Sequence, residues 1–159
     1  MDETGLLFSA NEVSEPWNRY VGEDENGICI CLTDEVRVTQ ADVRKIQLAK
    51  APIAAGIQIL LQEKGWQIKD IDQVILAGGF GSYMRKESAA AIGLIPKGLV
   101  SCTRSVGNAA GEGAVSAALA SEARTELEQL QKQMRYVELS THEAFSDIFI
   151  REMSFTSRF

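Results

Sequence analysis

The chain has 159 residues, of which 45% are hydrophobic and 24% are charged, with a formal net charge of −6. This length and near-average composition predict one globular domain without a membrane span. The acidic balance disfavours nucleic acid and anionic membrane surfaces as partners. The amino terminus carries Asp2 and Glu3 where a secretory signal needs basic residues, so we expect a cytoplasmic protein.

The first predicted elements are an arm and a hairpin. Residues 1–27 are polar and contain Pro16, which predicts an irregular arm ahead of a main lobe formed by residues 28–159. Two short strands are predicted at residues 28–33 and 36–39, joined by a tight reversal, and they form a hairpin.

A long helix is predicted over residues 40–64. Thr39 is its expected N-cap, Asp42 favours the helix dipole, and Gly65 ends it. Pro52 predicts a kink ahead of it, or a division into two helices. Apolar residues recur at threes and fours and predict a stripe that faces the core. The stripe consists of Val43, Ile46, Ile53, Ile57, Leu60 and Leu61.

The rest of the chain alternates strands and helices. The continuous apolar run of residues 73–77 predicts a strand in the middle of a covered sheet. Further helices are predicted at residues 86–92, 109–120, 122–135 and 143–153, and further strands at residues 100–103 and 136–139. This alternation indicates an α/β fold.

The sharpest motif is the glycine-rich turn after the strand at residues 73–77, Gly78-Gly79-Phe80-Gly81-Ser82. Paired glycines between a strand and a helix place backbone N–H groups and bare Cα atoms at the carboxyl edge of the sheet, where α/β folds bind ligands. A flat ring or a ribose can approach closely there. The alternative is a tight turn alone, because the spacing matches neither GxGxxG nor the phosphate loop.

A second motif consists of small residues. It runs from Gly107 to Ala114 and continues at Ala117, Ala118 and Ala120. Side chains this small let another backbone pack very close, which suits a hinge between helices and equally a static core.

Metal-binding and catalytic patterns are not predicted. The cysteines are Cys29, Cys31 and Cys102, and His142 is the only histidine. Zinc and iron–sulfur sites normally take four ligands at wider spacings, so we interpret Cys29 and Cys31, which lie on one face of a predicted strand, as core residues. We assign no catalytic residue and no metal ligand.

Several stretches together resemble the carboxyl-terminal domain of the reductive activators of corrinoid proteins. The most specific are the segment LAGGFGSY at residues 76–83 and the segment IGLIP at residues 92–96. The run at residues 38–50 and the segment VGNAAG at residues 106–111 extend the resemblance, which covers about residues 36–155.

The resemblance implies a fold and a site. These proteins are similar to the superfamily of acetate and sugar kinases, heat-shock chaperones and actin. The implied fold is α/β, one lobe of an actin-like (ribonuclease H-like) ATPase domain with a mixed sheet and flanking helices. By position in the motifs, the residues implied to face the adenosine are Gly78, Gly79 and Phe80, and those implied to lie at the hinge between lobes are Gly107, Ala110 and Gly111.

The resemblance also implies a function. Full-length family members join a ferredoxin-like [2Fe–2S] domain, a middle region and an ATPase domain, and use ATP to reduce cob(II)amide to cob(I)amide on a corrinoid protein. This sequence has no Asp-x-Gly-Thr phosphate motif and no cluster cysteines. We therefore expect it to supply the adenosine side of an ATP/ADP site, to need a missing amino-terminal lobe that carries the cluster, and not to turn over ATP alone. The corrinoid protein and that lobe are the implied partners.

Two alternatives stay open. One is the related activator of 2-hydroxyacyl-CoA dehydratases, which needs cluster cysteines between its lobes that Cys102 alone does not supply. A non-enzymatic docking module for a corrinoid protein is the other alternative. Such a module would bind only protein, whereas an activator lobe would bind adenine nucleotide.

Overall fold

The computed structural model describes residues 1–156, and the side chains of residues 80–82 are outside the description. Its strands form two sheets. The antiparallel sheet has the order β1 (Val21–Asp24), β2 (Gly27–Cys31) and β3 (Arg37–Thr39). The second sheet pairs β4 (Val74–Ala77) with β5 (Thr103–Gly107) in parallel.

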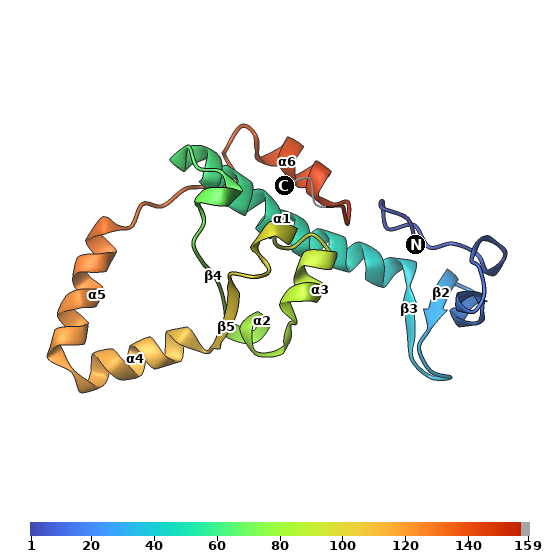
Figure 1. Ribbon diagram of the computed structural model, residues 1–159, viewed down its shortest axis with the longest axis horizontal. Coiled ribbons are helices and arrows are strands. Elements are labelled where there is room, and N and C mark those ends of the chain that lie inside the picture. Colours follow the sequence, from blue (N-terminus) through green and yellow to red (C-terminus); the bar gives the residue numbers. More distant parts are fainter. Residues whose placement is uncertain (157–159) are drawn as a thin grey trace.

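Helices connect and flank these sheets, as the α/β prediction required. The long helix α1 leads from β3 toward β4, and α6 lies along it (Figure 1). The helices are α1 (Gln40–Lys64), α2 (Gly78–Tyr83), α3 (Lys86–Ala91), α4 (Ala109–Leu119), α5 (Ser121–Gln133) and α6 (Phe145–Glu152). Short 3-10 turns occur at Ala10–Glu12, Trp17–Tyr20, Ile68–Asp70 and Lys97–Leu99.

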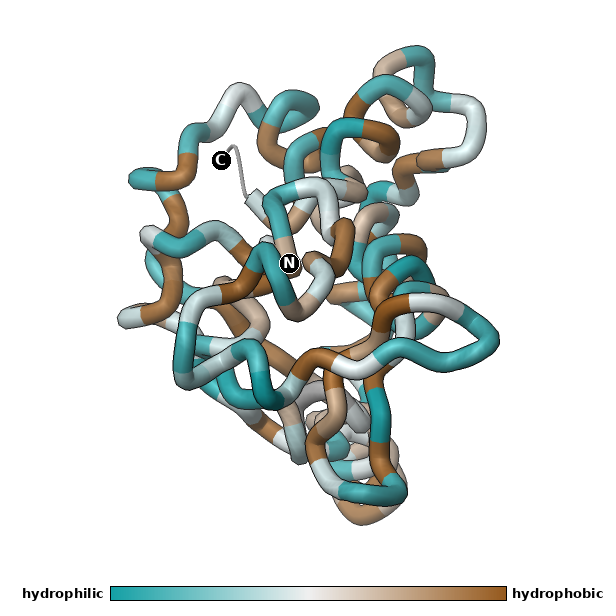
Figure 2. The backbone as a smooth tube through the Cα atoms, turned by 90° about the vertical axis from the view of Figure 1, so that its right-hand side faces the viewer, coloured by the Kyte–Doolittle hydropathy of each residue, from teal (hydrophilic) through white to brown (hydrophobic). Residues whose placement is uncertain are grey.

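Hydrophobic residues are interspersed along the chain. Figure 2 shows short hydrophobic stretches that are repeatedly broken by hydrophilic ones. Within residues 1–156, no helix combines the length and the apolar character that crossing a membrane requires.

The amino-terminal segment is more ordered than predicted. The expectation of an irregular arm is wrong for Val21–Asp24, which pairs with β2 so that Val21 lies opposite Ile30. The segment is polar, but pairing with a neighbouring strand satisfies its backbone groups, which local composition does not reveal. Hydrogen bonds also hold the segment on α1, since the Leu7 N–H donates to Gln40 Oε1 at 2.9 Å.

The predicted hairpin is confirmed. Strands β2 and β3 are antiparallel neighbours, with Cys29 opposite Thr39. At the reversal the Thr33 hydroxyl accepts from the N–H of Val36 at 3.0 Å. The Cys29 side chain is fully buried, as expected for a core cysteine, whereas Cys31, predicted for the core as well, is only partly buried.

The predicted bounds of α1 are confirmed. The Asp42 N–H donates to Thr39 Oγ1, and the Asp42 carboxylate accepts from the Thr39 N–H in return, which is a capping box. Gly65 ends the helix with a left-handed φ of 67°. Pro52 lies inside one helix, so the predicted division into two helices is wrong.

The predicted core stripe of α1 is wrong for half of its six members. Ile46, Ile53 and Leu60 are exposed. Small residues such as Ala51 and Ala55 are buried instead, because they let α6 approach α1 closely. The buried residues of α1 are Val43, Gln47, Lys50, Ala51, Ala54, Ala55, Gly56 and Ile59.

Three strand predictions also need correction. β4 forms as predicted but is not covered, and Ile75 is half exposed, because in the described part of the chain β4 pairs only with β5. The strand predicted at residues 100–103 begins only at Thr103, since Val100 continues a helical turn. Residues 136–139 form no strand, and two of their apolar side chains pack on the cluster between α1 and α6.

The capping box predicts a pH dependence of stability. Hydrogen bonds from the backbone N–H and hydroxyl of Thr39, together with Lys45, lower the pKa of Asp42 from 3.8 to about 2. The charged carboxylate therefore stabilises the fold above about pH 3.8, and this contribution is lost as the pH falls toward 2. We expect Asp42→Asn to have a lower melting temperature than the parent at pH 6, and the difference between the two melting temperatures to be smaller at pH 2.5. A gap that is equal at both pH values would contradict this assignment.

Candidate functional site at the parallel strand pair

The parallel pair brings the two glycine motifs together. In the register of β4 and β5, Ala77 lies beside Gly107, so each strand ends in a glycine segment at the same edge of the sheet. Gly78 follows Ala77 directly, and Asn108 follows Gly107. Residues about thirty positions apart in the sequence thus form one edge, where ligands bind in α/β folds (Figure 1).

The first glycine motif turns β4 directly into α2. Gly78 has a φ of 74°, a conformation that side chains rarely adopt, whereas Gly79 has no such positive φ. A Cβ atom placed on Gly79 would meet no atom within 4 Å. The backbone conformation at position 79 therefore does not require a glycine, and open space lies beside this residue. The side chain of Phe80, the third residue of this prediction, lies outside the described residues.

The second motif turns β5 into α4. Gly107 has a φ of 62°, and Asn108 caps the helix by accepting from the Gly111 N–H at 3.1 Å. A Cβ atom on Gly111 would come within 2.5 Å of the Asn108 side chain, so a larger residue there would make the capping side chain shift. Ala110 is exposed on the first turn of α4.

An open hollow lies against Gly79. It has a volume of about 420 Å³ and is lined by Gly79, Tyr83, Met84, Arg85 and Ser88. The Tyr83 side chain is 92% exposed, so its ring is free to stack on a flat ligand. Sequence reasoning missed Tyr83, Arg85 and Ser88, although an aromatic and a basic residue directly after a glycine turn were a usable signal.

Helices α4 and α5 extend away from the rest of the molecule (Figure 1). All of their residues are described, and none of them is buried. Apolar side chains on this arm, including Val115, Leu119 and Leu130, are exposed. Isolated helices of 11 and 13 residues are only marginally stable in water, so we expect these two helices to pack against a partner.

The remaining candidates for chemistry lie elsewhere. All three cysteines are free. Burial is the main cause that raises the pKa of the Cys29 thiol, and a hydrogen bond with Cys31 raises it further. Nδ1 of His142 accepts from the Ala144 N–H at 3.3 Å, just ahead of α6. Among residues 1–156, no three side chains of His, Cys, Asp or Glu gather as a set of metal ligands.

The fold is that of one lobe of an actin-like ATPase domain. The chain belongs to the family described as the C-terminal domain of RACo, the ASKHA domain, whose model matches residues 8–158. This confirms the family and the fold class predicted from the sequence.

Two relatives support the assignment. The chain is 34% identical over 150 residues to the corrinoid activation enzyme RamQ of Eubacterium limosum, a match that covers 93% of this chain and 24% of RamQ. Among solved structures, a reductive activator for corrinoid, iron-sulfur protein matches with a TM-score of 0.82 and 30% identity, over 97% of this chain and 25% of that one. The chain therefore spans about a quarter of the length of these relatives.

Proposed function

We propose that this chain is the carboxyl-terminal lobe of an ATP-dependent reductive activator of a corrinoid protein, and that its sheet edge binds the adenosine of ATP or ADP. The observation that carries the proposal is the register of β4 and β5, in which Ala77, directly ahead of Gly78 and Gly79, lies opposite Gly107. Membership in the ASKHA domain family and likeness to two corrinoid activators support it.

The edge fits an adenosine in two respects. Open space beside Gly79 lets a flat ring approach the backbone, and the neighbouring hollow is large enough for a base. Tyr83 can stack on the base, and the Ser88 hydroxyl can hydrogen-bond to it. Bound ATP would supply the energy that drives electron transfer to cobalt, while these residues would bind and orient the nucleotide.

The rest of the site is assigned to the part of the protein that this chain does not span. That part is proposed to supply the phosphate side of the site and the [2Fe–2S] cluster, and to pack on the exposed arm of α4 and α5. Gly107, Ala110 and Gly111 would then lie at the hinge between the two lobes. The proposed partner of the whole protein is a corrinoid protein, and its proposed location is the cytoplasm.

A chimera tests the proposal. The part of RamQ that this chain does not span is joined ahead of residues 1–159, and ATP-dependent formation of cob(I)amide on a corrinoid protein activated by RamQ is followed by absorbance. We expect the chimera to be active and the RamQ part alone to be inactive. A folded chimera that binds ADP but never forms cob(I)amide would refute the activator assignment. A folded chimera that binds the corrinoid protein but no nucleotide would favour the docking module.

The chain alone is predicted not to turn over ATP. Phosphoryl transfer depends on positioning the phosphates and a metal ion, and this sequence has no motif that cradles them. Purified chain should therefore release phosphate no faster than a heat-denatured control in magnesium buffer. A steady magnesium-dependent rate clearly above that control would contradict the division of the site between two lobes.

A further inference from the structure

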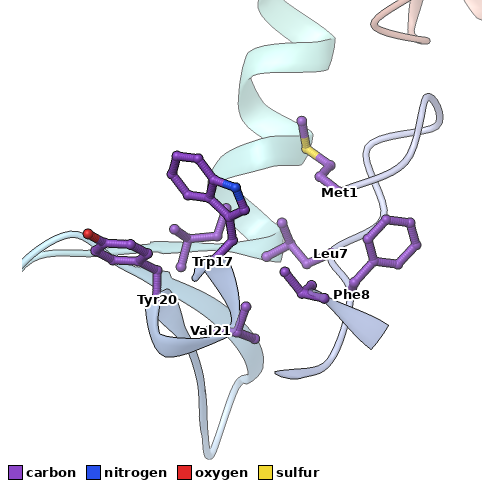
Figure 3. A pocket seen from close by; sticks show the side chains of 8 residues that line it. Met1, Leu7, Phe8, Trp17, Tyr20 and Val21 are labelled. Carbon is purple, nitrogen blue, oxygen red and sulfur yellow. The ribbon is translucent and has the colours of Figure 1, made fainter. Parts of the chain in front are cut away.

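An apolar cavity lies between the amino-terminal segment and the antiparallel sheet, at the opposite end of the molecule from α4 and α5 (Figures 1 and 3). Its volume is about 200 Å³, enough for one bulky side chain. The residues that line it include Leu7, Phe8, Trp17, Tyr20, Val21 and Ile30. Because the backbone of the buried Leu7 is hydrogen-bonded to Gln40 on α1, the cavity has a fixed wall.

The rim of this aromatic cavity has the composition of a protein-binding hot spot. Trp17 is 65% exposed, and its ring lies 6.2 Å from that of Tyr20. The Arg19 guanidinium lies over the Tyr20 ring at 4.8 Å. Trp, Tyr and Arg are the residues that most often dominate binding at protein interfaces.

The segment that builds the cavity is acidic, although Arg37 on β3 pairs with one of its acids, Asp24, at 3.5 Å. Residues 1–35 contain nine acidic side chains and one basic one, Arg19, a formal charge of −8 against −6 for the whole chain. One of the acids lies on the cavity face itself, because Glu23 is two residues beyond Val21 on β1 and so points to the same side of the sheet. Glu23 is exposed there.

We propose that the aromatic cavity docks another protein, whose contact segment inserts a bulky apolar side chain flanked by Lys or Arg. Charge complementarity selects this occupant, since a basic segment is attracted to the acidic surround. A second copy is disfavoured, because a symmetric dimer through this face would oppose two acidic surfaces. The proposal does not depend on the nucleotide edge.

Synthetic peptides test the proposal on the whole chain carrying Trp66→Phe, in which Trp17 is the only tryptophan. The probe is a heptapeptide with a central phenylalanine, flanked on each side by one glycine and two lysines. One comparison peptide has alanine at the centre, and the other has glutamates in place of the lysines. We expect the probe to change Trp17 fluorescence and to bind at least tenfold more tightly than either comparison peptide.

Variants of the otherwise native chain locate the site by calorimetric titration. Trp17→Ala should lower the affinity for the probe to that for the alanine peptide. Trp66→Ala, which removes another tryptophan that is 52% exposed, should leave the affinity for the probe unchanged. Trp66 follows the end of α1 and the cavity lies near its start, and this helix of 25 residues is about 37 Å long, so the control lies far from the cavity. Glu23→Lys should lower the affinity for the probe severalfold without lowering the melting temperature. This variant still tests the site if Trp17→Ala fails to fold.

Four results would overturn the proposal. They are no binding of the probe, equal binding of the alanine peptide, equal binding of the glutamate peptide, and a dimer in sedimentation that Glu23→Lys leaves intact but Trp17→Ala dissociates. The third would indicate a purely apolar ligand site, and the fourth an interface between copies.

Discussion

Replacing Lys50 by methionine is expected to lower the free energy of unfolding by about 3–5 kcal/mol. Lys50 on α1 and Glu152 on α6 are 2% and 1% exposed, with Nζ and Oε2 4.0 Å apart. Nζ also donates to the Ser154 carbonyl, and Gln58 donates to Glu152 Oε1 at 2.8 Å. Glu152 Oε2 has no hydrogen-bond partner among the described residues, so without Lys50 a carboxylate would be buried with little compensation.

Two further variants sharpen this prediction. Lys45→Met removes a lysine of the same helix that is 77% exposed and pairs with Asp42, which is 42% exposed, and should cost less than about 1 kcal/mol. Burial lowers the pKa of Lys50 more than Glu152 raises it, so desolvation outweighs the attraction between the two charges. Adding Glu152→Leu to Lys50→Met should therefore recover most of the lost stability. Urea unfolding measures all three, and equal losses for Lys50→Met and Lys45→Met would refute the role of the pair.

Gly79→Val is expected to lower the affinity of the RamQ chimera for ADP at least tenfold, about 1.4 kcal/mol. In the ligand-free chain a Cβ atom at Gly79 meets nothing within 4 Å and the φ is not left-handed, so the variant should keep its fold. The added branches would instead occupy the space proposed for the adenosine. Calorimetric titration with ADP and melting without ligand measure the two effects separately.

Gly78→Val is the matched control. Gly78 has a φ of 74°, so a side chain there strains the backbone and should lower the melting temperature without any nucleotide. Unchanged ADP affinity in a well-folded Gly79→Val chimera would mean that the paired glycines serve only as a turn. Tyr83→Ala then tests the same hollow from its exposed aromatic side.

Elements with strong local signals could be predicted from the sequence. Thr39, Asp42 and Gly65 bound α1 correctly because capping acts between residues a few positions apart. The hairpin and the paired helices α4 and α5 were predicted for the same reason. The glycine-rich segments also sufficed to predict the family, because their motifs are short and specific.

Tertiary structure alone decided which surfaces are buried and which distant residues meet. The sequence favoured the large aliphatic residues of α1 as its core face, yet α6 packs on the small ones and buries Lys50 against Glu152, about one hundred residues away. The apolar run of β4 indicated a strand but not whether another layer covers it. The register that sets Ala77 beside Gly107 depends on pairing between distant segments. Local propensity cannot encode such contacts, because their free energy exists only once the chain has brought both partners together.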